Sequence, residues 1–171
     1  PCLNFNKFLI RKQGYTKFNL LGASVIARDY GTWMNTLMID RGTDSGIKTY
    51  MPVIVPQGVV GFVSEVYLKT ARVQLVLDPR TTVGGIVQRP TSRVASMVSG
   101  NSGKQGVLSF INIAKEADVI KGDRVVTSGY GGVYPKGLLI GTVENVSDDL
   151  EKVSLDADIR PAVCLLYTSD A

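Results

Sequence analysis

The stretch that decides the fold runs from Asp118 to Val146 and reads DVIKGDRVVTSGYGGVYPKGLLIGTVENV. Two apolar runs, Val125–Val126 and Leu138–Ile140, flank a segment that is rich in glycine and contains Pro135. Short apolar runs bounded by glycine and proline are typical of two strands joined by a tight loop. The sequence therefore predicts a β-hairpin here.

An internal repeat extends this prediction beyond the hairpin. Residues 57–66 read QGVVGFVSEV, and residues 136–146 read KGLLIGTVENV. Both have a polar residue, a glycine and two aliphatic residues, followed by Gly-x-Val-x-x-Val, with a one-residue insertion in the second copy. Self-similarity of this kind indicates two copies of one structural unit. We expect two small β modules.

Composition and strand spacing favour an all-β fold. The chain has 171 residues, 44% of them hydrophobic and 20% charged, which is typical of a packed globular protein. Short strands are predicted at residues 25–28, 36–40, 51–56, 59–66, 72–78, 83–89, 94–98, 106–113 and 152–160. Strands at such spacing, separated by turn signals, indicate a sandwich or barrel, and closed barrels leave no exposed sheet edges. We predict two small β-barrel domains in tandem, preceded by the remnant of an N-terminal coiled-coil helix.

The predicted domains are residues 24–78 and 79–163, divided at Asp78-Pro79, where proline ends a strand. In residues 153–159 the odd-numbered positions are apolar, which predicts one buried face. The sequence leaves open whether this last strand returns to the first barrel. Residues 1–23 are predicted to be a linker or coiled-coil remnant. Residues 164–171, CLLYTSDA, look like a translated sequencing adapter and are expected to be a non-native tail.

The charge distribution argues against nucleic-acid binding. The net charge is +4, and residues 1–23 carry all of it as four basic residues without an acidic one. The remaining residues hold 15 basic and 15 acidic side chains. A neutral body offers no electrostatic footprint for a phosphate backbone. No apolar run approaches the roughly 20 residues that span a bilayer, and the chain does not start with a signal peptide.

The chain contains no histidine, which removes the commonest general base and metal ligand. Asp44-Ser45-Gly46 is similar to the run around a protease nucleophile, but without a histidine we interpret it as turn chemistry. A Ser128–Lys136 dyad is the remaining enzymatic alternative. The glycines of residues 129–132 are predicted to adopt positive φ rather than to bind phosphate, because a strand-like run follows them. We predict no catalytic residue, metal site or cofactor.

Aromatic residues in or beside loops are the candidate binding residues. They are Tyr30, Trp33, Tyr50, Phe62, Tyr67, Tyr130 and Tyr134. Aromatic side chains are enriched at the energetic centres of protein interfaces. Four of them lie in or near the repeated hairpins, and we predict partner contact at Phe62, Tyr67, Tyr130 and Tyr134.

Motifs along both halves of the chain follow one another in a characteristic order. They are VIARD (25–29), Trp33, TLMIDRG (36–42), DSGI (44–47), MPV (51–53), GVVG (58–61), RVQLVLDP (72–79), KGDRVVTSG (121–129) and PKG (135–137). Over residues 24–163 this series resembles the extracytoplasmic part of the MreC family of rod shape-determining proteins.

The resemblance implies a non-enzymatic scaffold of the bacterial cell-elongation machinery. Members of the family have a membrane helix, a coiled coil and two small β-barrels on the periplasmic face of the cytoplasmic membrane. They self-associate as dimers or filaments, and they contact the class B penicillin-binding transpeptidase, MreD and the complex that follows the MreB filament. By this resemblance residues 1–23 are the coiled-coil remnant, and the membrane anchor is missing from this sequence.

Two rival functions stay open beside the scaffold, an enzyme such as a Ser–Lys hydrolase and a carbohydrate-binding β module on the wall polymer. The chain is alternatively a β module that binds peptidoglycan and has no scaffold role. Such a module would sediment with purified peptidoglycan in the absence of partner proteins.

Overall fold

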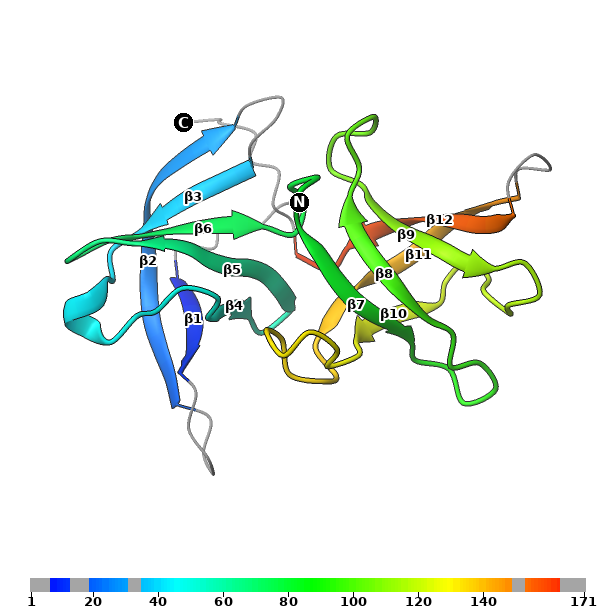
Figure 1. The fold of residues 1–171 in the computed structure, drawn as a ribbon, viewed down its shortest axis with the longest axis horizontal. Helices are drawn as coiled ribbons and strands as arrows, with labels where there is room; N and C mark the ends of the chain where they lie inside the picture. The colour runs from blue at the N-terminus through cyan, green and yellow to red at the C-terminus, as the bar shows by residue number, and fades with distance from the viewer. Residues whose placement is uncertain (1–6, 13–18, 31–34, 149–152, 164–171) are drawn as a thin grey trace.

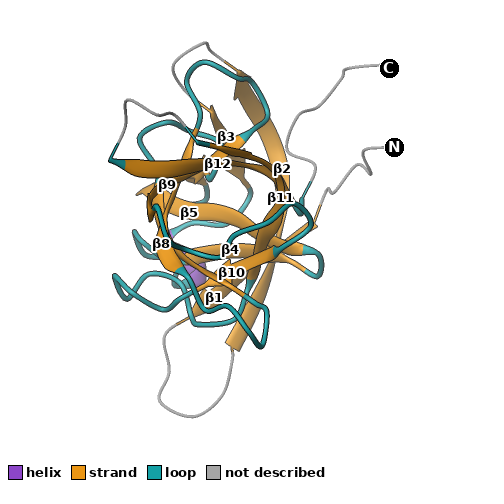
Figure 2. Ribbon diagram, turned by 90° about the vertical axis from the view of Figure 1, so that its right-hand side faces the viewer, coloured by secondary structure: helices purple, strands orange, loops and turns teal. Residues whose placement is uncertain are grey.

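The fold consists of two β-barrels side by side (Figure 1). The computed structural model describes residues 7–12, 19–30, 35–148 and 153–163. Within these residues the elements are strands, apart from one 3-10 turn at Thr43–Ser45 (Figure 2). The first barrel contains β1 (Lys7–Lys12), β2 (Asn19–Tyr30), β3 (Asn35–Ile39), β4 (Pro52–Val55), β5 (Gly58–Val66) and β6 (Ala71–Leu75). The second contains β7 (Thr82–Val87), β8 (Ala95–Gly100), β9 (Leu108–Ala114), β10 (Arg124–Thr127), β11 (Leu139–Ser147) and β12 (Ser154–Pro161).

The two barrels have the same strand order. The first closes in the order β1-β2-β3-β6-β5-β4, and the second closes in the order β7-β8-β9-β12-β11-β10. Neighbouring strands are antiparallel throughout. Each strand of the second barrel is therefore equivalent to the strand that comes six strands earlier in the chain, so that β7 corresponds to β1 and β12 to β6. The predicted all-β fold with two tandem barrels is confirmed.

The sequence repeat falls on the equivalent strands β5 and β11. A Cβ added to Gly61 or Gly141 would lie 2.1 or 2.2 Å from a carbonyl oxygen of the neighbouring strand, so only glycine fits at either position. Beyond these glycines both strands shift register against the next strand, after Val63 and after Val143. The repeated residues therefore encode a close strand contact followed by a β-bulge, which bends each sheet.

Alternating apolar side chains fill the barrels. In β12, Leu155, Ala157 and Ile159 are buried, and their polar neighbours face outward, as the alternation predicted. Val153, assigned to the same buried face, is instead 94% exposed, because it precedes the strand and has no neighbouring strand to cover it. The buried side chains of the two barrels form one continuous core. The barrels therefore pack on each other rather than being joined only by a linker.

The connection between the barrels is short. β6 ends at Leu75 and β7 begins at Thr82, so Asp78-Pro79 lies between the barrels. The last strand, β12, pairs with β11 and β9 and remains in the second barrel.

The N-terminal residues differ from the expectation. Residues 7–12 form β1 and β2 begins at Asn19, so the helical prediction is wrong for these parts of the segment 1–23. β1 pairs with β2 and with β4, which closes the first barrel. A local apolar pattern cannot reveal a pairing with a strand that comes later in the chain. Residues 1–6 and the predicted tail, 164–171, lie outside the described residues.

Candidate functional site

A groove of about 350 Å³ lies where the two barrels meet. The first barrel contributes Tyr50 and Phe62, and the second contributes Met97, Tyr130 and Tyr134. The lining is completed by Arg80, Thr81, Thr82, Val83, Gly84, Gly131 and Val133. Large exposed aromatic rings that gather in a concave site are typical of binding surfaces.

The first wall of the groove is a stacked aromatic pair. The ring centroids of Tyr50 and Phe62 are 5.9 Å apart and their planes differ by 11°. Tyr50 is 67% exposed and has a φ of 64°, and its N–H donates to the carbonyl of Val63 at 2.7 Å. A left-handed conformation costs a residue with a side chain about 1–2 kcal/mol. The fold therefore keeps the Tyr50 ring at the surface even though the backbone conformation of this residue is unfavourable.

The second wall is the loop between β10 and β11. The positive φ values predicted for its glycines are present, at Gly129 (85°), Gly131 (87°) and Gly132 (72°). The buried hydroxyl of Thr127 donates to the carbonyl of Pro135 and accepts the N–H of Leu138 at 2.8 Å, which closes the base of the loop. Tyr130 projects from this anchored loop and is 78% exposed.

Strand β7 supports the same loop. The N–H of Ser128 donates to the carbonyl of Gly84 at 2.8 Å, and a Cβ added to Gly84 would lie 2.5 Å from the Ser128 hydroxyl oxygen. That hydroxyl accepts the N–H of Tyr130 at 3.3 Å. Ser128, the nucleophile of the enzymatic alternative, therefore shapes the loop that carries Tyr130.

Tyr134 is the one buried tyrosine of the described groove lining. The residue is only 6% exposed, and among the residues that the structure describes no group forms a hydrogen bond with its hydroxyl. Burial raises the pKa of this hydroxyl. A buried polar group without a partner costs about 1–3 kcal/mol.

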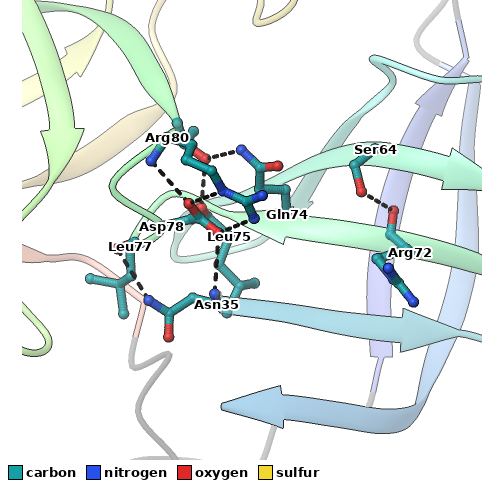
Figure 3. A network of polar contacts seen from close by, with 9 residues as sticks. Asn35, Ser64, Arg72, Gln74, Leu75, Leu77, Asp78 and Arg80 are labelled. Atoms are coloured by element: carbon teal, nitrogen blue, oxygen red, sulfur yellow. Dashed lines mark hydrogen bonds and ion pairs between the residues drawn. The ribbon is translucent and has the colours of Figure 1, made fainter. Parts of the chain in front are cut away.

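A buried carboxylate lies next to the groove at the junction of the barrels (Figure 3). Asp78 is fully buried and accepts the Nε–H and Nη2–H of Arg80 at 2.9 and 2.8 Å. It also accepts the backbone N–H groups of Arg80 at 2.9 Å and of Asn35, in β3, at 3.1 Å. Burial by itself would raise the pKa of Asp78, but the hydrogen bonds and the charge of Arg80 outweigh it, so the pKa is lowered.

Further close contacts fix the junction. The Thr81 hydroxyl donates to the carbonyl of Leu75 and accepts the Gln74 amide, each at 2.9 Å. A Cβ added to Gly58 would lie 2.3 Å from the carbonyl oxygen of Leu139, across the contact between the barrels. These contacts fix the position of one wall of the groove relative to the other.

The structure brings together three of the four residues predicted to contact partners. Phe62, Tyr130 and Tyr134 line the groove. Tyr67 does not line it. The Tyr67 hydroxyl donates at 2.6 Å to Glu65, which forms an exposed ion pair with Arg72 of β6. Sequence reasoning missed Arg80, although Asp78-Pro79, just before it, marks the predicted domain boundary.

In the part of the chain that the structure describes, no cluster of three or more His, Cys, Asp or Glu side chains is arranged to hold a metal ion. None of the helical structure in that part is long and apolar enough to cross a membrane.

Comparisons with known proteins agree over most of the chain. Residues 25–169 match the family described as rod shape-determining protein MreC, barrel core. The cell shape-determining protein MreC of Listeria monocytogenes is 34% identical over 146 residues, which are 84% of this chain and 49% of that protein. The crystal structure of MreC from Pseudomonas aeruginosa superposes with a TM-score of 0.76 at 28% identity and covers 91% of both chains. This chain spans about half the length of the curated relatives it matches.

Two more distant structures share the fold. One is the major periplasmic domain of the cell shape-determining filament MreC, with a TM-score of 0.71 and 22% identity over 82% of this chain and 86% of the other. The other is MreC of Helicobacter pylori, solved in complex with a penicillin-binding protein (PBP2). It has a TM-score of 0.62 at 16% identity, over 80% of this chain and 83% of that chain.

Proposed function

The chain belongs to the MreC family of rod shape-determining proteins, and on that premise we propose that it is the extracytoplasmic part of a non-enzymatic scaffold. The scaffold maintains rod shape by self-associating and by organising peptidoglycan synthases outside the cytoplasmic membrane. Relatives named as cell shape-determining proteins, a periplasmic domain from a filament and a complex with a penicillin-binding protein support this proposal.

The observation that carries the proposal is the groove between the barrels. It exposes aromatic rings from both barrels, and the only charged side chain in its described lining is that of Arg80. Aromatic residues near an arginine are the composition of interface hot spots. We assign this groove to the class B penicillin-binding transpeptidase, with Phe62, Tyr130 and Tyr134 as contact residues.

Alanine substitution tests the assignment. We expect Tyr130→Ala to weaken binding of the extracytoplasmic domain of the transpeptidase about 30-fold, the effect of losing a hot-spot residue of about 2 kcal/mol. Tyr67→Ala is the matched control, because Tyr67 is also exposed but lies outside the groove. Titration calorimetry measures both. If Tyr67→Ala weakens binding and Tyr130→Ala does not, the contact lies on the far side of the first barrel.

The remaining partners belong to the whole protein. We propose that the full-length protein is anchored by an N-terminal membrane helix, and that it contacts MreD and the complex linked to the MreB filament. The sequence of the complete gene tests the anchor directly. An upstream apolar helix followed by heptads is the expected result, and a fused catalytic domain would contradict the scaffold.

A second candidate function rests on a polar hollow of about 350 Å³ on the second barrel. Asn101 accepts two backbone N–H groups there, and Lys104 forms an ion pair with Asp158 at 2.5 Å. The lining combines amides, hydroxyls and carboxylates with the apolar side chains of Ile111 and Val146, a composition that suits the hydroxyls and ring faces of a sugar. This hollow favours the peptidoglycan-binding alternative, which predicts sedimentation of the purified protein with peptidoglycan and loss of that sedimentation in Asp158→Ala.

A further inference from the structure

We propose that Met97 is an oxidation site, at which a peroxide converts the thioether to a sulfoxide and thereby weakens docking of the transpeptidase in the groove. This rests on the proposed function and adds a form of regulation to the same groove.

The methionines of the chain differ in their exposure. Met97 lines the groove and is 39% exposed. Met51 is 8% exposed and its sulfur accepts the N–H of Lys48 at 3.4 Å, while Met38 is half-buried in β3. Oxidation of a sulfur-containing side chain depends on how easily the oxidant reaches it. Among the methionines that the structure describes, Met97 is therefore the one that oxidises first.

Met97 is also a neighbour of Tyr130. It pairs with Gly84 of β7, and directly opposite residues of an antiparallel pair point to the same face with their Cβ atoms about 5 Å apart. Gly84 has no side chain, and the Cβ of Tyr130 lies 3.3 Å from the position that a Gly84 Cβ would take. The side chains of Met97 and Tyr130 are therefore close together in the groove, with no side chain of Gly84 between them. A change in the polarity of Met97 acts next to the exposed ring of Tyr130.

The reaction needs only the thioether and a peroxide. The sulfur lone pair attacks one peroxide oxygen, and the O–O bond breaks as the S–O bond forms. The other oxygen leaves as hydroxide, takes up the proton of the transferred oxygen and becomes water. Sulfur loses two electrons, and the peroxide gains them. Methionine sulfoxide reductases reverse the change.

The sulfoxide is a poor contact for an apolar partner. A thioether is apolar and adapts its shape to aromatic neighbours, whereas a sulfoxide is polar. Docking of a partner against the aromatic rings removes water from the sulfoxide oxygen, and a polar group that is buried without a hydrogen bond is unfavourable. Oxidation of Met97 is therefore expected to lower the affinity of the groove for the transpeptidase.

The test oxidises this protein alone and then measures binding. The purified protein is treated with hydrogen peroxide, the peroxide is removed, and peptide mass spectrometry locates the added oxygen. Titration calorimetry with the untreated extracytoplasmic domain of the transpeptidase then compares each variant with and without treatment. We expect treatment to weaken binding by the wild type about five- to tenfold, and a methionine sulfoxide reductase to restore it. Thermal unfolding of the treated wild type is expected to be unchanged.

Two substitutions assign the effect to one sulfur. Treatment should not change the affinity of Met97→Leu, because leucine has no sulfur to oxidise. Met38→Leu is the matched control, since Met38 lies outside the groove, and treatment should weaken its binding as it does for the wild type. If Met38 or Met51 takes up oxygen before Met97, or if treated Met97→Leu loses affinity like the wild type, Met97 is not the oxidation site.

The remaining outcomes separate this inference from the proposed function. If the treated wild type keeps its affinity while Tyr130→Ala binds weakly, the groove is the docking site but oxidation of Met97 does not regulate it. If the treated wild type unfolds at a lower temperature, the loss of binding follows from lost stability, and regulation at the groove is refuted. If Tyr130→Ala binds like the wild type, the transpeptidase does not use the groove, and both proposals are overturned.

Discussion

Replacing Asp78 with alanine is expected to destabilise the protein by about 3–4 kcal/mol, because this carboxylate ties the junction of the two barrels to β3. The substitution removes the acceptor of two backbone N–H groups, those of Asn35 and Arg80. Each hydrogen bond to a buried charged acceptor contributes about 1.5–2 kcal/mol. The Arg80 guanidinium is half exposed and rehydrates, so its loss of a partner adds little.

Urea denaturation followed by circular dichroism measures this change. For a protein of this length a loss of 3–4 kcal/mol corresponds to a melting temperature about 10 °C lower. The matched control is Glu65→Ala, which breaks an exposed ion pair with Arg72 (3.4 Å) and is expected to cost less than about 1 kcal/mol. A loss in Asp78→Ala no larger than that of the control would refute the claim that the buried carboxylate stabilises the junction.

The same residue predicts how stability depends on pH. The pKa of Asp78 is lower in the folded protein than its ordinary value of 3.8. Its contribution is therefore fully present above that value and is lost as the pH falls through the lower pKa of the folded state. Asp78→Asn, which cannot ionise, should be less stable than the wild type at neutral pH and should approach it in acid. An equal difference at every pH would contradict this assignment.

Three further perturbations test the packing. The pKa of Tyr134 is raised above its ordinary 10.0, so its contribution to the free energy of unfolding should be fully present below about pH 10 and be lost as the pH rises further. Tyr134→Phe should remove that part of the alkaline loss of stability, measured by circular dichroism. Gly58→Ala should lower the free energy of unfolding in urea by about 2–3 kcal/mol, since its Cβ would lie 2.3 Å from a carbonyl oxygen of β11. Gly22→Ala is the control and should be tolerated, because a Cβ there would have no atom within 4 Å. Leu155→Ala should lower the free energy of unfolding by about 2–5 kcal/mol, and Val153→Ala by less than about 0.5 kcal/mol. If calorimetry shows equal losses of stability for the two variants, the buried face of β12 is misassigned.

The fold class could be read from local patterns because a barrel strand carries its own signature. Leu155, Ala157 and Ile159 alternate with polar residues, and that period of two requires no knowledge of the neighbouring strands. The repeated Gly-x-Val-x-x-Val of residues 61–66 and 141–146 goes further, because it marks the same bulged strand in each barrel. Such features depend only on residues that are close together in the chain, so the sequence alone indicates them.

The N-terminal strands show where this reasoning ends. β1 has a short apolar pattern that also fits a helix, and only its pairing with β2 and β4 makes it a strand. The choice depends on hydrogen-bond partners that come from later in the chain, and a local pattern does not contain them.

By itself the sequence determined the all-β class, the doubling of one unit and the absence of histidine chemistry, because these follow from residue type and from spacing along the chain. Only the tertiary structure decided the candidate site. Tyr50 and Tyr130 belong to different barrels, and they share a groove because β5 packs near β11 and Asp78 fixes the junction. The unpaired hydroxyl of Tyr134 is likewise a property of its surroundings, since burial and hydrogen bonding depend on which residues the fold brings near it.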